Sequence, residues 1–271
     1  MSTDPPIHSI EINGTPADVD GLRTPALINY GHFSSMQAYA GGVRGLDLHL
    51  HRLAEATREL FATELDVAQV RAWMRKLAGS CAGLATLRVN VFSHALDRDR
   101  PIRPAAPDVM IAIAPAREIA ATPLRVCSAR YARELPHIKH VGTFGLMQQK
   151  RSAQARGYDD VVFVDAQGTI SEASIWNIGF FDDHGVVWPD APALRGVSLQ
   201  LLQRGLRERA VASSTRSVAL SNLSSLRGAF FTNTSRAVMP IAAIDDIAFE
   251  LDASRIALLE ECYSANPWQP I

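Results

Sequence analysis

The sequence predicts an α+β protein built from many short strands and fewer helices. Short segments that alternate between apolar and polar residues, or that are apolar throughout, recur along the chain in the manner of buried strands. Segments with helical spacing of apolar residues separate some of them. The chain has 271 residues, 47% of them hydrophobic, so it can bury a substantial core in one large domain or two closely packed ones.

The first part of the chain mixes extended segments with helices. We expect strands at residues 8–12, 26–30, 34–39, 84–92 and 109–114, and helices at residues 46–61 and 66–77. The composition then turns to Pro, Ala and charged residues in PAREIAATP, which is typical of a linker. This places a domain boundary between a small α/β domain, residues 1–118, and a larger domain, residues 119–271.

The second part is predicted to be mainly β. A strand at residues 124–129 precedes a helix at 146–156, and the apolar segment DDVVFVD is a strong strand. Further strands are expected in TISEASIWNIGFF, VVWPD and AFFTN, with helices near residues 198–208 and 252–263. This alternation suits a mixed, largely β domain.

Charge and cysteine content exclude several classes of function. The 27 basic and 28 acidic residues give a net charge of −1 without a run of like charges, so nothing indicates nucleic acid. Cys81, Cys127 and Cys262 are odd in number, and no apolar segment is long enough to span a membrane. The N-terminal residues also lack a basic region followed by an apolar one, so we expect a cytoplasmic, reduced protein without a membrane role.

Only three of the basic residues are lysines, which limits amine chemistry to three side chains. Lys76 lies on the polar side of a predicted helix and Lys150 among polar residues of another, so both are expected at the surface. Lys139 instead lies between Pro136 and Gly142 in LPHIKHVG, a segment predicted to be extended and partly buried. Burial and the neighbouring histidines would lower its pKa toward the neutral, nucleophilic amine. Position alone nevertheless favours a lysine that extends to solvent from a strand edge.

The residues that follow Lys139 change this interpretation. Glu172 lies 33 positions after Lys139 in a T/S-E-x-x-x-x-N motif that ends at Asn177, after an apolar strand and a turn. This segment resembles the class IV aminotransferases, which include branched-chain and D-amino acid aminotransferases and aminodeoxychorismate lyase. The resemblance implies that Lys139 holds pyridoxal 5'-phosphate as a Schiff base. It also implies that Glu172 keeps the ring nitrogen protonated. Without this context, a solvent-facing glutamate in a Ser-rich turn is the commoner situation.

Three further segments resemble the phosphate-binding elements of this family. LDLHLHRL resembles an H-x-x-R-L motif, which implies that Arg52, with His49 beside it, grips the phosphate. ALRGVSLQLL resembles an L-P-G-I-T-R turn at a helix start, and FFTNTSRAVMPI resembles a later loop. The implied phosphate ligands are Gly196, Val197, Ser198 and Thr234. Taken alone, the arginine would be a surface residue and the Gly-Val-Ser segment a helix cap.

The expected pocket departs from the better-known relatives. Phe144 stands where the family's aminotransferases often carry a tyrosine, and Phe33-Ser34-Ser35 replaces the usual F-E-G, closer to the F-T-T of aminodeoxychorismate lyase. Phe33, Ser35 and Phe144 are therefore candidate substrate residues. Arg88 or Arg236 is a candidate for binding a substrate carboxylate, although a structural ion pair explains either arginine equally well.

The resemblance implies a fold-type IV protein with a small α/β N-terminal domain and a larger, β-rich pseudo-barrel domain. The cofactor would lie between them, in a homodimer without a metal ion. The expected reaction moves an amino group between an amino acid or amine and a 2-oxo acid. Two alternatives stay open, namely a lyase that releases pyruvate and a pyridoxal phosphate-binding protein without catalysis.

Overall fold

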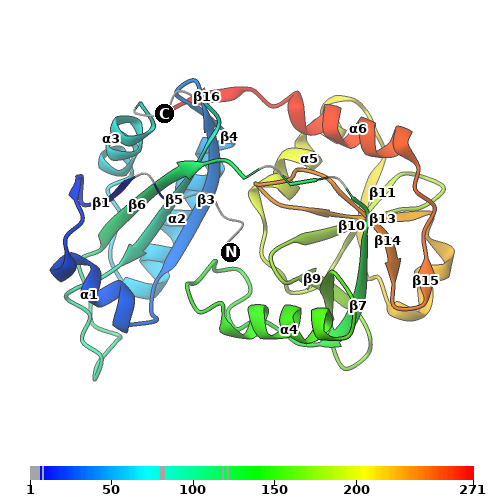
Figure 1. Cartoon of the computed structure of the whole chain (residues 1–271), viewed down its shortest axis with the longest axis horizontal. Coiled ribbons are helices and arrows are strands. Elements are labelled where there is room, and N and C mark those ends of the chain that lie inside the picture. Colours follow the sequence, from blue (N-terminus) through cyan, green and yellow to red (C-terminus); the bar gives the residue numbers. More distant parts are fainter. Residues whose placement is uncertain (1–6, 8, 80–82, 118, 121) are drawn as a thin grey trace. The chain divides into compact units, whose positions relative to one another are not determined.

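The computed structural model describes residues 7, 9–79, 83–117, 119–120 and 122–271, and the chain forms two compact units (Figure 1). The first unit comprises Met1–Glu118, Ile138–Gly142 and Pro267–Ile271, and the second comprises Ile119–His137 and Thr143–Asn266. The first unit thus includes the chain up to residue 118, together with two later segments. Two short segments of the predicted C-terminal domain, Ile138–Gly142 and Pro267–Ile271, belong to the first unit.

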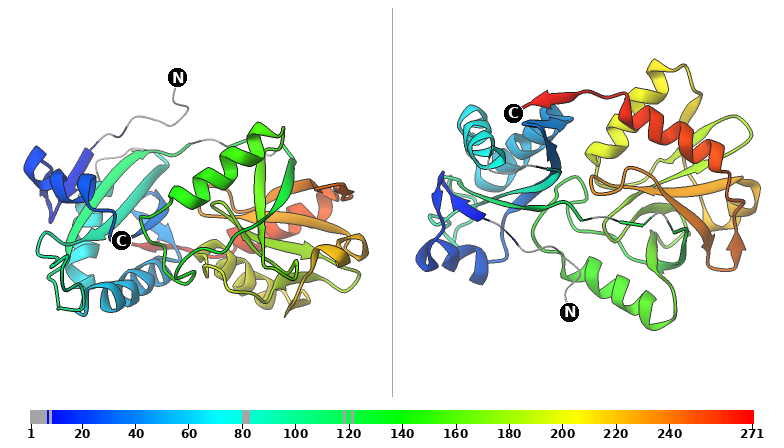
Figure 2. Two further views of the ribbon diagram at one scale, coloured as in Figure 1. Left: turned by 90° about the horizontal axis from the view of Figure 1, so that it is seen from below. Right: turned by 45° about the horizontal axis from the view of Figure 1, so that its top comes forward.

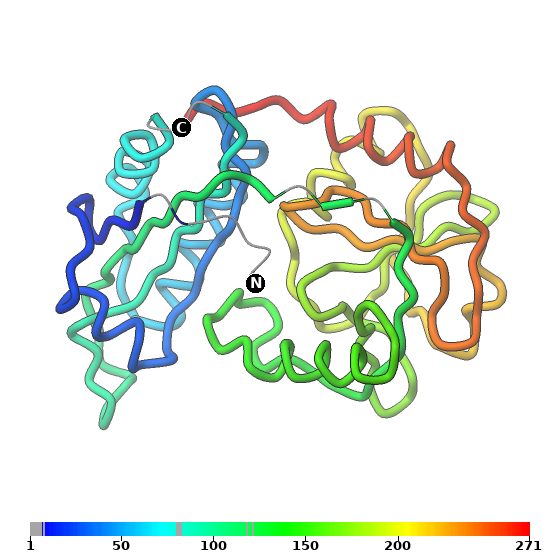
Figure 3. The backbone as a smooth tube through the Cα atoms, viewed as in Figure 1, coloured from blue at the N-terminus to red at the C-terminus, as the bar shows by residue number. Residues whose placement is uncertain are grey.

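The first unit contains an antiparallel seven-stranded sheet with the order β16-β4-β3-β5-β6-β1-β2. Figure 3 shows the C-terminal strand β16, in red, beside β4, in blue. The strands are β1 (Ser9–Ile12), β2 (Thr15–Pro16), β3 (His32–Tyr39), β4 (Gly42–Arg44), β5 (Ala85–Phe92), β6 (Asp108–Pro115) and β16 (Trp268–Pro270). The expected strand at 8–12 is described only from Ser9, because His8 lies outside the described residues.

Two amphipathic helices cover this sheet, α2 (Leu46–Phe61) and α3 (Val67–Ala78). Apolar residues recur every three or four positions along α2, which places Leu46, Leu50 and Leu53 in one buried row. The side chain of Asp66 caps α3 by accepting a hydrogen bond from the Gln69 amide. The helices and the sheet share one hydrophobic core.

The predicted strand at residues 26–30 is wrong. Residues up to Leu27 belong to helix α1 (Val19–Leu27), and Ile28 is its extended C-cap. Asp18 begins this helix by accepting a hydrogen bond from the Gly21 amide at 2.7 Å. The cap lies eight residues before the apolar segment, so a short window on residues 26–30 detects the apolar residues but not the helix that they end.

The second unit is a curled nine-stranded sheet with the order β12-β11-β10-β13-β14-β7-β8-β9, and β15 pairs with β14 (Figure 1). Three pairs are parallel, β7–β8, β7–β14 and β11–β12, and the others are antiparallel. The strands are β7 (Leu124–Arg130), β8 (Asp160–Val164), β9 (Ile170–Ala173), β10 (Asn177–Phe181), β11 (Val186–Pro189), β12 (Ser213–Arg216), β13 (Gly228–Thr232), β14 (Met239–Ile244) and β15 (Ile247–Ala248).

Helices pack on this sheet from different sides (Figure 2). Helix α4 (Phe144–Ala155) covers the face of β7 and β8 that carries Cys127, Val161 and Phe163. Helices α5 (Val197–Glu208) and α6 (Ala253–Ser264) pack against each other and against Trp188 and Phe230. A short 3-10 helix, η1 (Leu220–Ser225), precedes β13. The predicted α+β class is confirmed, and no helix in the described part of the chain is long and apolar enough to cross a membrane.

Candidate functional site

Lys139 lies in an extended segment at the edge of the first unit's sheet. The Phe33 amide donates to the Lys139 carbonyl at 2.9 Å, and the Val141 amide donates to the Gly31 carbonyl at the same distance. The segment therefore pairs antiparallel with the start of β3. The Lys139 ammonium nitrogen Nζ lies 4.8 Å from the centroid of the Phe33 ring. The half-buried Lys139 is thus extended on a sheet edge, between Pro136 and Gly142.

Arg52 projects from α2 into a polar network with β3. Its Nη2 donates to the Ser34 hydroxyl at 2.5 Å, and the same hydroxyl lies 2.7 Å from Nδ1 of His49. Burial lowers the pKa of His49 well below its ordinary value, and the charges of Arg52 and Lys139 lower it further. A neutral His49 can accept a hydrogen bond from the Ser34 hydroxyl group, while the oxygen of that group accepts one from Arg52. The network therefore fixes the guanidinium of Arg52.

The candidate substrate residues of the first unit lie around the Phe33 ring. The guanidinium carbon of Arg88 lies 3.7 Å from that ring's centroid, and its Nε donates to Asn90 at 2.9 Å. Ser35 is the cross-strand partner of Arg88 in the β3–β5 register. Phe33, Ser35, Arg88 and Lys139 thus form one neighbourhood within the first unit.

In the second unit, Glu172 is a buried carboxylate on β9 with fixed donors. Its Oε2 accepts hydrogen bonds from Nη2 of Arg133 at 3.2 Å and from the Leu194 amide at 3.3 Å. The side chains of Arg133 and Glu172 are only 5% and 7% exposed, so this is a buried ion pair. Arg133 also donates to the Pro136 carbonyl at 3.2 Å. Sequence reasoning missed Arg133, because its partner lies 39 residues away.

Asn177 on β10 holds the turn that precedes α5. Its Nδ2 donates to the Leu194 carbonyl at 2.6 Å, and its Oδ1 accepts from the Gly196 amide at 3.1 Å. A Cβ atom at Gly196 would lie 2.1 Å from Asn177 Oδ1, so any other residue there would displace the Asn177 side chain. Helix α5 then begins at Val197, and its first turn contains Ser198. Glu172, Asn177 and Gly196 are therefore linked through the same turn.

The start of α5 fits an anionic group. Within the described part of the chain, the hydroxyl groups of Ser198 and Thr232 are buried and have no hydrogen-bond partner. A buried hydroxyl group without a partner is unusual and indicates that a ligand or water supplies one. The N-terminus of a helix adds backbone amides and a favourable dipole for a phosphate. Thr232 at the end of β13 is a second residue that sequence reasoning missed, two positions before the predicted Thr234.

The other predicted site residues of the second unit are Thr234, Arg236 and Phe144. Thr234 is half-buried in a tight turn, in which Asn233 Oδ1 accepts the amides of Ser235 and Arg236. The Arg236 guanidinium donates to Glu260 at 2.9 Å and to the Val238 carbonyl at 3.0 Å. Phe144 is the first residue of α4 and is 79% exposed. The second unit thus gives Arg236 the structural ion pair that was the alternative to carboxylate binding.

The expectation that Lys150 lies at the surface is wrong. Its side chain is only 22% exposed, and Nζ forms an ion pair at 2.7 Å with Asp160, which is 1% exposed. The polar neighbours of Lys150 in the sequence concealed a buried partner on β8. Lys76, by contrast, is 58% exposed, and it pairs with Glu11 at 3.0 Å.

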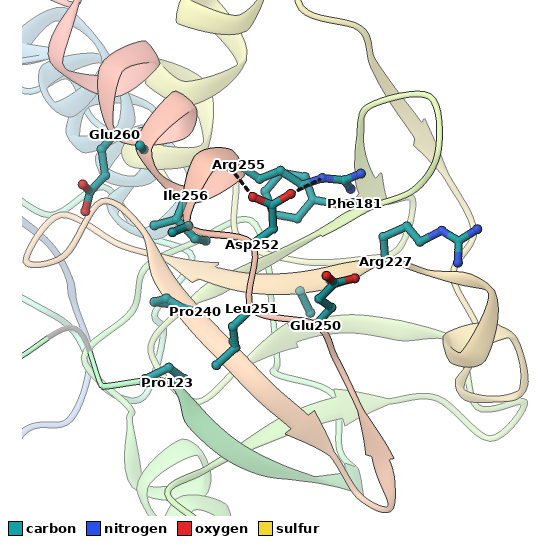
Figure 4. Close-up of a pocket in the computed structure, with 14 residues that line it drawn as sticks. Pro123, Phe181, Arg227, Pro240, Glu250, Leu251, Asp252, Arg255, Ile256 and Glu260 are labelled. Carbon is teal, nitrogen blue, oxygen red and sulfur yellow. Dashed lines mark hydrogen bonds and ion pairs between the residues drawn. The ribbon is translucent and has the colours of Figure 1, made fainter.

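Described residues of the second unit also line two hollows of note. One, of about 300 Å³, is lined by residues such as Phe181, Leu251 and Arg255 (Figure 4). None of its described lining residues was predicted as a site residue. The other, of about 360 Å³, is lined in part by Asn177 and Leu194 and so adjoins the turn before α5.

Known proteins resemble this chain in sequence and in fold. A probable branched-chain-amino-acid aminotransferase of Rickettsia felis is 30% identical over 97 residues, which is 35% of this chain and 33% of the relative. The match thus spans about a third of that relative's length. A branched-chain aminotransferase from Thermoproteus uzoniensis, solved with norvaline, has a TM-score of 0.83 at 18% identity, covering 95% of this chain and 94% of its own.

A putative 4-amino-4-deoxychorismate lyase from Legionella pneumophila has a TM-score of 0.79 at 17% identity, covering 93% of this chain and 96% of its own. At such identities the likeness shows the fold, which is that of the fold-type IV aminotransferases as expected. The model of the family described as amino-transferase class IV matches residues 31–244. This match covers the candidate site residues of both units. The chain belongs to the class IV aminotransferase family.

Proposed function

We propose that this protein is a pyridoxal phosphate-dependent aminotransferase that moves an amino group between an amino acid or amine and a 2-oxo acid. The observation that carries the proposal is the buried Glu172 carboxylate, fixed by two donors and linked to a glycine turn at a helix N-terminus. These are the groups that a pyridine nitrogen and a phosphate require. The family match supports the same cofactor.

Residues in each unit suit particular groups of the cofactor. The guanidinium of Arg52 and the start of α5, with Gly196, Val197 and Ser198, suit the phosphate, and Thr234 is a further candidate ligand. Glu172 suits the ring nitrogen, and Asn177 holds the turn between them. Bound pyridoxal phosphate supplies an aldehyde for the amine and an electron sink for the bond that breaks.

The chain's own groups then bind, orient and move protons. In its neutral form, the Nζ amine of Lys139 is a nucleophile toward the cofactor and, once released, a base for the substrate's carbon-bound proton. Ser34 and His49 hold the Arg52 guanidinium in one orientation. Arg133 and the Leu194 amide orient the Glu172 carboxylate. In this scheme Lys139 serves as both anchor and general base.

Arg88 is the better candidate for a substrate carboxylate. It is exposed in the first unit and lies against Phe33, the ring that Lys139 also contacts, whereas Arg236 is paired with Glu260. We expect Arg88→Ala to raise the KM for the amino donor about tenfold or more, as loss of a charged hydrogen bond does. Arg236→Ala is the matched control, and a KM that neither replacement changes would exclude both arginines.

The decisive experiment is spectroscopic. The purified protein with added pyridoxal phosphate should absorb in the visible range, and borohydride should attach the cofactor covalently to a peptide that contains Lys139. Lys139→Ala should not be labelled. Mixing the protein with amino acids should then yield pyridoxamine phosphate. A wild-type protein that takes up no pyridoxal phosphate would refute the proposal.

A lyase of the aminodeoxychorismate type is the second candidate. Phe33-Ser34-Ser35 and the fold of the Legionella protein favour it. Such an enzyme would release pyruvate from aminodeoxychorismate without an amino acceptor, which separates it from a transaminase. A protein that binds the cofactor but is inert toward amino acids and aminodeoxychorismate would instead be a non-catalytic relative. We also propose that the protein is a homodimer and that it is cytoplasmic. Sedimentation tests the first statement, and fractionation of cells tests the second.

A further inference from the structure

We propose that the partly buried Lys150–Asp160 ion pair is a positioning device that sets the geometry of Glu172 and Asn177. The inference rests on the proposed function, because it assigns the pair's purpose to the candidate cofactor residues. Lys150 lies on α4, Asp160 begins β8, and Glu172 and Asn177 lie on β9 and β10. These residues lie on four different elements, so Asp160 links them through tertiary contacts.

Asp160 receives four hydrogen bonds although it is 1% exposed. Its Oδ2 accepts from Lys150 Nζ at 2.7 Å and from Trp176 Nε1 at 3.1 Å. Its Oδ1 accepts from the Ser174 hydroxyl at 2.6 Å and from the Val161 amide at 2.8 Å. A carboxylate offers about four lone-pair positions, so these donors occupy its capacity. Both oxygens are therefore fixed in direction.

Two of these donors come from the connection between β9 and β10. Ser174 is two residues after Glu172, and Trp176 immediately precedes Asn177. The Ala173 amide donates to the Trp176 carbonyl at 2.9 Å, which closes the turn. Asp160 thus holds both sides of a turn whose two ends carry candidate cofactor residues. Asn177 in turn holds Gly196, so the effect extends to the start of α5.

Lys150 supplies the charge that a buried carboxylate needs. An isolated buried charge is costly, whereas a paired and fully hydrogen-bonded one is tolerated. A well-packed apolar pair would give similar stability in many proteins. It could not, however, bind the Ser174 hydroxyl and the Trp176 N–H at once. Positioning of the β9–β10 turn, rather than stability alone, therefore accounts for the pair. Lys150 also joins the helix that begins five residues after Lys139 to this same turn.

The test compares Asp160→Asn with Asp159→Asn in the full-length protein. Both replacements preserve side-chain size, but Asp159 is exposed and accepts from the Arg125 amide, outside the β9–β10 turn. We expect Asp160→Asn to weaken pyridoxal phosphate binding about tenfold, measured by fluorescence titration. It should also move the pH profile of the bound cofactor's absorbance in the same direction as Glu172→Gln does. Asp159→Asn should change neither quantity.

The double variant Asp160→Asn/Glu172→Gln separates positioning from a general structural effect. If Asp160 acts through Glu172 and Asn177, the double variant loses less cofactor affinity than the sum of the two single losses. Fully additive losses, or wild-type affinity in Asp160→Asn, would overturn the inference. If Asp160→Asn does not fold, Trp176→Phe removes one donor and keeps the ring beside Phe231, and it should weaken binding in the same direction. A wild type that binds no cofactor refutes the proposed function instead.

Discussion

His32 is a buried histidine on β3 whose Nε2 lies 3.0 Å from the Thr57 hydroxyl. Burial, followed by the charge of Arg52, lowers the pKa of His32 to about 3 from its ordinary 6.5. Below pH 6.5 the unfolded chain therefore binds a proton that the folded chain does not, so acidification favours unfolding. We expect this histidine to remove about 1 kcal/mol of stability per pH unit between roughly pH 6 and 4. Urea unfolding at several pH values measures it.

His32→Gln should reduce that slope, and His184→Gln, at an exposed position, should not. Equal slopes in His32→Gln and the wild type would contradict the assignment.

At this scale the sequence could indicate residues within local motifs, such as Glu172 and Asn177. It could not indicate Arg133 or the partial burial of Lys150. Strand pairing brings Glu172 close to Arg133, and the packing of α4 on β8 brings Asp160 close to Lys150.

Helices α5 and α6 approach closely at Gly205. A Cβ atom there would lie 2.0 Å from the carbonyl oxygen of Cys262. Replacing a helical glycine by alanine ordinarily stabilises a helix by up to about 1 kcal/mol. Here the backbone of α6 blocks the methyl group, so we expect Gly205→Ala to cost about 1–3 kcal/mol in the free energy of unfolding. Urea unfolding at neutral pH checks this.

Gly79→Ala is the control for Gly205→Ala, because the nearest atom to a Cβ at Gly79 is at 3.4 Å and its backbone is helical. A stabilised Gly205→Ala variant would contradict the packing.

Sequence periodicity predicted the helix at 46–61 with its observed bounds, since its apolar row is long and regular. The strand at 26–30 failed because a short apolar segment is compatible with a helix end as well as a strand.

At the scale of the whole molecule, sequence composition indicated a boundary at residue 118, but not that Ile138–Gly142 would join the first unit. Pairing of this segment with β3 depends on contacts over a hundred residues apart in the chain. Lys139 therefore belongs to the first unit and Glu172 to the second. Under the proposed function both residues bind the cofactor, so its binding should depend on the folding of each unit.

The tryptophans allow the two units to be observed separately, because Trp73 and Trp268 lie in the first unit and Trp176 and Trp188 in the second. One variant would keep the first pair and the other the second, with phenylalanine replacing the remaining two. Because loss of Trp176 is itself expected to weaken cofactor binding, each variant receives pyridoxal phosphate in the same excess over its own Kd. A ligand that needs both units native stabilises both, by about 2.7 kcal/mol at a hundredfold excess over its Kd. We therefore expect pyridoxal phosphate to raise the urea midpoint of both variants, and by less when Lys139 is replaced by alanine. A shift confined to one pair of tryptophans would mean that one unit binds the cofactor alone, because a ligand cannot stabilise a unit whose unfolding leaves its binding intact.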